Sequence, residues 1–172
     1  MKRSKLTHLV IAALLAALVL VITRLSFPIG AGGYIHVGDS MIYLAVLMLP
    51  LPYALPAAML GAGLADFTSG YAVYVIPTVL IKAAMVLAAK GLIRLPKKAI
   101  LQDLLICATG VITVAGYYLA DVVLALLSGS GTAAAFSAPV AYIPFNTIQA
   151  VASGALYLLL ARGARNIRWA AD

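Results

Sequence analysis

Long apolar stretches, interrupted by short polar or proline- and glycine-rich segments, dominate the pattern along this chain. Six of them predict helices, with expected bounds of residues 6–23, 37–50, 53–66, 72–94, 103–127 and 139–162. A helix that spans a bilayer needs about 20 residues, so the second and third are short for a full crossing. The glycine-rich segment 24–38 is expected to be a loop. The pattern therefore predicts one all-α domain over residues 1–172, an integral membrane bundle of six transmembrane helices.

Polar residues recur on one face of the last three expected helices. In 72–94, Tyr74, Thr78 and Lys82 are four residues apart, which places them on one helical face. Two further stripes have similar spacing: Thr109, Thr113, Tyr117 and Asp121 in 103–127, and Tyr142, Asn146, Gln149 and Ser153 in 139–162. Polar faces in lipid must turn toward the protein interior. The three stripes therefore predict one polar cavity between these helices.

A single lysine, Lys82, lies well inside an apolar helix, roughly 15 Å from its end at about 1.5 Å per residue. A charge at that depth is costly without a partner. It is either part of a structural ion pair, for which Asp66 and Asp121 are the candidate acids, a snorkelling lysine, or part of a site for a polar solute. Asp39 is either the cap of the second helix or a member of the same site.

The expected solute site lies in the outer half of the bundle. Amide and charged side chains need external partners when buried, and tyrosine rings offer flat surfaces for stacking. Three residues are expected at the outer rim of the cavity. The candidate substrate-binding residues are His36, Asp39 and Asp66 at the rim and Tyr74, Lys82, Tyr117, Asp121, Asn146 and Gln149 inside.

Composition supports the membrane assignment and excludes several functions. The chain is 65% hydrophobic and 10% charged, with a mean hydropathy of +1.09, whereas soluble domains are nearer half apolar and a quarter charged. The net charge of +7 does not indicate nucleic acid binding, because the basic residues cluster at helix ends. There is no metal-ligand spacing and no phosphate-binding glycine loop, so neither a metal nor a cofactor is expected.

The distribution of basic residues predicts the orientation. Six spans place both termini on one side, and nine of the twelve Lys and Arg residues fall on that side. The positive-inside rule then makes the termini cytoplasmic. These nine residues are Lys2, Arg3, Lys5, Arg94, Lys97, Lys98, Arg162, Arg165 and Arg168.

The first expected helix carries small residues in place of a polar stripe. Ala12 and Ala16, and Ala13 and Ala17, form two overlapping AxxxA spacings. Small residues four apart let another membrane helix approach closely. These four alanines are therefore expected to form a docking face for a membrane partner.

Three segments resemble the substrate-binding S components of energy-coupling factor (ECF) vitamin transporters, in their riboflavin-type branch. They are HVGDSMIYLAVLMLP at 36–50, GLADFTSGYAVYVIPTVLIKA at 63–83 and PFNTIQA at 144–150. The resemblance covers nearly the whole chain, in order and with matching spans. It implies a multi-pass protein of a prokaryotic plasma membrane that binds a vitamin near its outer face.

The resemblance also implies partners and a mechanism. A transmembrane T component would contact the AxxxA face of the first helix, and two cytoplasmic ATPases would hydrolyse ATP, while the S component topples in the membrane to release its solute. This chain would catalyse no reaction. In riboflavin-binding members a lysine follows the PFN motif where Gln149 stands here. The implied substrate is therefore pyridoxine-like, hydroxymethylpyrimidine-like or riboflavin-like.

Two other classes of function remain open from the sequence. A stand-alone secondary transporter, coupled to a proton or sodium gradient, usually shows internal repeats with broken helices, and none is visible here. An intramembrane enzyme would use Asp66, Lys82 and Asp121 as acid–base groups. It would convert a candidate substrate into a covalently changed product.

Overall fold

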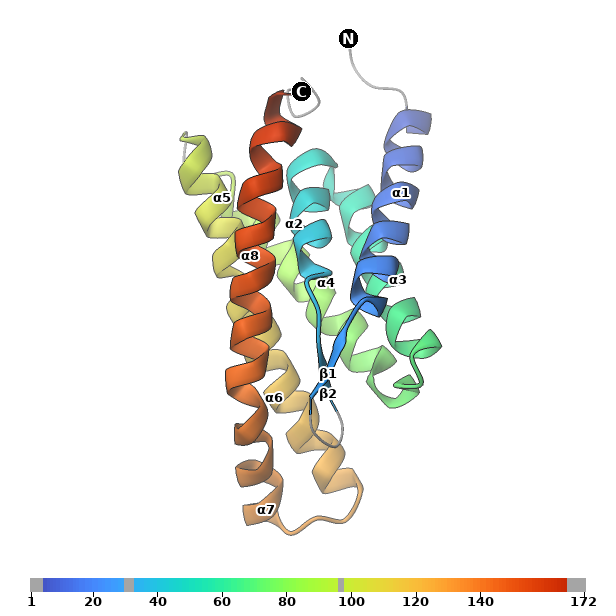
Figure 1. Cartoon of the computed structure of the whole chain (residues 1–172), viewed down its shortest axis with the longest axis vertical. Coiled ribbons are helices and arrows are strands. Elements are labelled where there is room, and N and C mark those ends of the chain that lie inside the picture. The colour runs from blue at the N-terminus through green and yellow to red at the C-terminus, as the bar shows by residue number, and fades with distance from the viewer. Residues whose placement is uncertain (1–4, 30–32, 96–97, 167–172) are drawn as a thin grey trace.

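The structure is a computed structural model that describes residues 5–29, 33–95 and 98–166. It is a bundle of helices with one small hairpin (Figure 1). In chain order the elements are α1 (Lys5–Arg24), β1 (Phe27–Ile29), β2 (Gly33–Ile35), α2 (Asp39–Met48), α3 (Leu51–Thr68), the 3-10 turn η1 (Ala72–Tyr74), α4 (Val75–Leu92), α5 (Ala99–Ala108), α6 (Gly110–Leu127), α7 (Thr132–Ser137), the 3-10 segment η2 (Ala138–Tyr142) and α8 (Ile143–Asn166).

Several consecutive elements continue one another, so the described residues form six helical rods at nearly the expected positions. Only Thr109 separates α5 from α6, and α7, η2 and α8 follow without a break. Within the described part of the chain, four stretches are long and apolar enough to cross a membrane: Lys5–Arg24, Ala72–Leu92, Ala99–Leu127 and Thr132–Arg165. The helix α2 is apolar but shorter. The start of α1 and the end of α8 lie at the same end of the bundle (Figure 1).

The segment between α1 and α2 is not the irregular loop expected from its glycines. Strands β1 and β2 pair in antiparallel register, with Phe27 opposite Ile35, and β2 lies against α8. The residues of β1 and β2 pair because strand pairing satisfies their backbone polar groups. The hairpin therefore places the residues just before α2 between α1 and α8.

The short helix α2 is the centre of the packing. Its residues from Asp39 to Val46 are all buried, as expected for a helix surrounded by others. The Lys90 ammonium of α4 donates hydrogen bonds to the carbonyl oxygens of Val46 and Leu49. These bonds satisfy carbonyls that the end of a helix leaves without partners.

Close contact between α1 and α3 depends on small residues. A Cβ atom at Gly61 would lie 2.6 Å from the carbonyl oxygen of Ala16 and 2.7 Å from Cβ of Val19. No side chain fits between these backbones. In lipid no hydrophobic force acts between helices, so such close packing contributes directly to their association.

Candidate solute-binding site

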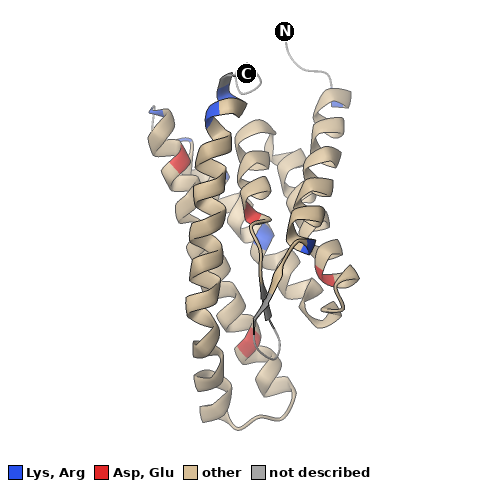
Figure 2. Ribbon diagram, viewed as in Figure 1, with Lys and Arg blue, Asp and Glu red and all other residues tan. Residues whose placement is uncertain are grey.

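A buried ion pair joins α2 to α4. The Lys82 ammonium lies 2.8 Å from Oδ1 and 2.9 Å from Oδ2 of Asp39, and both side chains are 1% exposed. The acid is the first residue of α2, where the helix dipole favours a negative charge. The expectation that Asp66 or Asp121 would be the acid of a structural pair with Lys82 was wrong, because Asp39 takes this place. Figure 2 shows where the acidic and basic residues lie in the bundle.

A third helix, α6, adds a hydrogen bond and a ring contact to this pair. The Thr113 hydroxyl of α6 donates to Oδ2 of Asp39 at 3.2 Å and lies 3.3 Å from the Lys82 ammonium. The ammonium also lies 5.3 Å from the centroid of the Tyr117 ring, within the range of a cation–π contact. Thr113 was part of the polar stripe but was not among the candidate site residues. Its four-residue spacing from Tyr117 was the signal that could have identified it.

The role of Asp39 differs from that of a helix cap. Gly38 occupies the N-cap position, without a side-chain hydrogen bond, and the Asp39 carboxylate turns to Lys82. A Cβ atom at Gly38 would lie 2.0 Å from the Thr23 hydroxyl of α1, so a side chain here would force Thr23 to move. The absence of a side chain lets the start of α2 approach α1 closely enough for Asp39 to lie inside the bundle.

His36 adjoins the ion pair from the end of the hairpin. Its backbone N–H donates to Oε1 of Gln149 at 3.3 Å, and its Nδ1 accepts from the backbone N–H of Gly38 at 3.1 Å. An accepting Nδ1 carries no proton, so the imidazole is neutral. Burial lowers the pKa of His36 from 6.5 to about 4; the Asp39 carboxylate opposes this shift and the Lys82 ammonium adds to it.

Two hydroxyl contacts continue the polar cluster along α4 and α6. The Tyr74 hydroxyl donates to Oδ1 of Asp121 at 2.8 Å, and the hydroxyls of Thr78 and Tyr117 lie 3.0 Å apart. Tyr74, Tyr117 and Asp121 are only partly buried. Polar residues of η1 and α4 therefore meet polar residues of α6 inside the bundle.

The residues expected at the rim are instead buried. His36, Asp39 and Asp66 are 6%, 1% and 4% exposed. The hairpin and the inward position of the start of α2 account for the first two. Asp66 lies near the end of α3, where its carbonyl oxygen accepts hydrogen bonds from the backbone N–H groups of Ser69 and Tyr71.

The two candidate residues on α8 have different surroundings. Gln149 is 2% exposed, and its Oε1 atom accepts a hydrogen bond from the backbone N–H of His36. Asn146 is half-buried, and its side chain makes no hydrogen bond among the described residues. Asn146 is therefore the more available of the two for a ligand.

The four alanines of α1 do not share one face. Ala12 is buried and Ala16 is half-buried against α3, whereas Ala13 and Ala17 are exposed. Within this bundle, only the second pair is accessible to a membrane partner.

Apolar helices of membrane-spanning length that enclose a buried ion pair and further polar contacts are typical of a membrane protein. The sequence matches the family model described as ECF-type riboflavin transporter, S component, over residues 3–165. The chain therefore belongs to this family: it is a transmembrane S component, the substrate-binding subunit of an ECF transporter, and is not itself a catalyst.

A solved structure supports the fold. It is titled "Structure and mechanism of the S component of a bacterial ECF transporter" and has a TM-score of 0.65 and 20% sequence identity. The similarity covers 95% of this chain and 98% of that chain. A comparison with curated proteins finds no significant match.

Proposed function

We propose that this chain captures a water-soluble vitamin or vitamin precursor from outside a prokaryotic cell, for uptake driven by a T component and two ATPases. In this proposal all six helical rods lie in the plasma membrane, the termini are cytoplasmic, and the solute binds toward the opposite end. The proposal is supported by membership of the S-component family and by the meeting of polar stripes from α4 and α6.

The observation that carries the proposal is that some of the polar residues are already bonded to one another, whereas others remain accessible to a ligand. Lys82 and Asp39 neutralise each other, and Gln149 accepts from His36. These residues link α2 to α4 and the end of the hairpin to α8, so their role in the site is structural.

We expect the solute to contact residues that still have unused hydrogen-bond donors or acceptors. Asn146 is half-buried, Asp121 has one carboxylate oxygen beyond the one that Tyr74 contacts, and α6 packs against α8. The partly exposed rings of Tyr74 and Tyr117 add surfaces on which a flat heterocycle can stack.

The substrate class follows from these contacts. A heteroaromatic ring with hydrogen-bonding substituents could stack on a tyrosine ring and bond to the Asn146 amide and the Asp121 carboxylate. Pyridoxine, hydroxymethylpyrimidine and riboflavin all have this chemistry. Gln149 provides no positive charge to a solute, in contrast to a lysine at that position. Pyridoxine and hydroxymethylpyrimidine, which have smaller rings, are therefore proposed as substrates in addition to riboflavin.

The first experiment is native mass spectrometry of the purified protein, to detect a co-purified small molecule. Equilibrium binding of the three named compounds follows. Asn146→Ala should lower the affinity about five- to a hundredfold, because one neutral hydrogen-bond partner contributes about 1–3 kcal/mol in a buried site. Thr147→Ala is the matched control, because that hydroxyl bonds to the carbonyl oxygen of Ile143 on its own helix.

Two results would contradict the proposal. Unchanged affinity in both Asn146→Ala and Asp121→Asn would place the site elsewhere. Uptake by this chain alone, dependent on an ion gradient and independent of any ATPase, would indicate the secondary transporter instead.

A further inference from the structure

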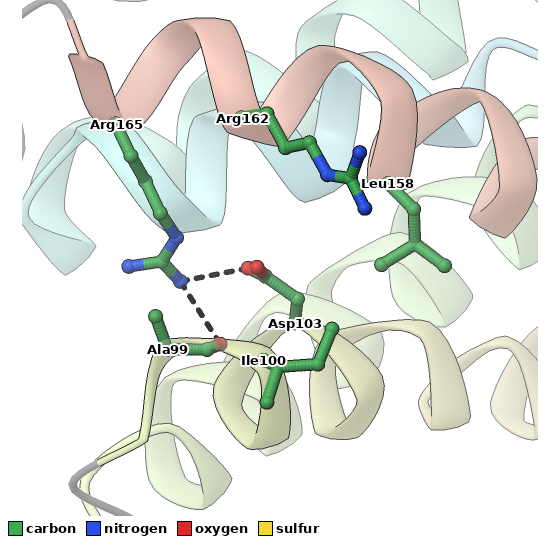
Figure 3. A pocket seen from close by; sticks show the side chains of 6 residues that line it. All are labelled: Ala99, Ile100, Asp103, Leu158, Arg162 and Arg165. Atoms are coloured by element: carbon green, nitrogen blue, oxygen red, sulfur yellow. Dashed lines mark hydrogen bonds and ion pairs between the residues drawn. The ribbon is translucent and has the colours of Figure 1, made fainter.

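A pocket of about 380 Å³ lies between α5 and α8, near the end of the bundle where α1 begins and α8 ends. It is distinct from the polar cluster around Lys82. Six residues line it: Ala99, Ile100 and Asp103 from α5 and Leu158, Arg162 and Arg165 from α8 (Figure 3). Its lining combines an apolar part with two guanidinium groups.

One ion pair fixes the polar side of this pocket. The Asp103 Oδ1 atom accepts a hydrogen bond from Arg165 at 2.7 Å and another from the Tyr157 hydroxyl at 2.6 Å. The same Arg165 nitrogen lies 3.4 Å from the Ala99 carbonyl oxygen and 3.4 Å from Oε1 of Gln102. Asp103 therefore holds Arg165 at the pocket wall.

The donors in the pocket exceed what the protein uses. The Nε–H group of Arg165 is buried and has no acceptor among the described residues. Arg162 is exposed, lies beside the pocket in Figure 3, and forms no hydrogen bond or ion pair with the described part of the chain. Two arginines against one aspartate leave a formal charge of +1, so an anion with several acceptor oxygens would complement the pocket.

The surroundings of the pocket favour a lipid as the source of that anion. Ile100 and Leu104 on α5 and Leu159 on α8 are 59%, 49% and 74% exposed, as expected for side chains in contact with acyl chains. The arginines lie near the end of α8, and the ends of membrane-spanning helices are where basic side chains reach lipid headgroups. Basic pockets between membrane helices bind anionic headgroups in this way.

We propose that the pocket between α5 and α8 binds the phosphate of an anionic phospholipid in the leaflet at the end of the bundle where α1 begins and α8 ends. The two guanidinium groups contact the phosphate oxygens, Asp103 keeps Arg165 in position, and the acyl chains lie along the exposed apolar residues of α5 and α8. The occupant anchors these two helices to that leaflet.

The test is native mass spectrometry of the detergent-purified protein with added phosphatidylglycerol or phosphatidylcholine of matched acyl chains. Phosphatidylglycerol should bind in preference. Arg162→Gln should reduce its affinity about fivefold, which corresponds to about 1 kcal/mol for one arginine at the membrane surface. Arg94→Gln is the control, because it removes the same charge from another exposed arginine outside the pocket and should leave the affinity within about twofold.

Three outcomes would overturn the proposal. Equal loss of phosphatidylglycerol in the two variants would indicate general charge attraction instead of a site. Equal binding of phosphatidylcholine by the parent protein would show that the anionic headgroup is not recognised. Displacement of the lipid by inorganic phosphate would show that the pocket takes a free anion.

Discussion

The contribution of the ion pair between Lys82 and Asp39 to the stability of the bundle can be tested by substitution. At 2.8 Å, the attraction between the charges is about 6 kcal/mol at an effective dielectric of about 20, offset largely by the cost of removing both from water. In Lys82→Met, the carboxylate stays buried with Thr113 as its partner. We therefore expect a loss of about 3–5 kcal/mol of unfolding free energy.

The corresponding measurement is the melting temperature of the apo-protein in detergent. For a chain of this length, that loss corresponds to a decrease on the order of 10 °C. Asp39→Asn should destabilise the protein similarly, because it leaves the ammonium uncompensated. The double variant should melt above either single variant, since neither charge is then isolated.

A substitution at an exposed lysine provides the control for this experiment. Lys98→Met removes the same charge outside the bundle and should change the free energy by less than about 0.5 kcal/mol. The reasoning is refuted if Lys82→Met melts like the parent protein and only the stabilisation by added vitamin decreases. Lys82 would then be a ligand group, and its contact with Asp39 would contribute little.

Three further predictions concern orientation, docking and pH. In a Cys107→Ala background, a cysteine at Ser130 should react with a membrane-impermeant thiol reagent in intact cells and one at Lys98 should not; the reverse pattern would contradict cytoplasmic termini. Ala17→Trp should abolish co-purification with a T component without changing the melting temperature, because this residue is exposed; retained complex formation would exclude this face. Because the pKa of His36 is lowered in the fold, the unfolded state binds more protons between about pH 6.5 and 4, so stability should decrease as the pH falls through that window, by up to about 3 kcal/mol. His36→Asn keeps an acceptor near the Nδ1 position and should show a smaller decrease; an equal decrease would refute the assignment.

Local features of the sequence determined the class of protein and the faces of its helices. Apolar runs of membrane-spanning length and polar residues four apart depend only on helical periodicity, and the structure confirms the helices. The particular contacts of Tyr74 with Asp121 and of Thr78 with Tyr117 were not predicted and came from the structure. The cost of a charge in lipid required a partner for Lys82 wherever the chain placed it.

Only the tertiary structure decided which residue that partner is. Asp39 lies 43 positions before Lys82, and no periodicity relates a residue of α2 to one of α4. Their contact depends on the hairpin, on the lack of a side chain at Gly38, and on the burial of α2 among the other helices. The same packing separated Ala12 and Ala16 from Ala13 and Ala17, because sequence spacing defines a helical stripe but the neighbouring helix α3 determines which part of it is covered.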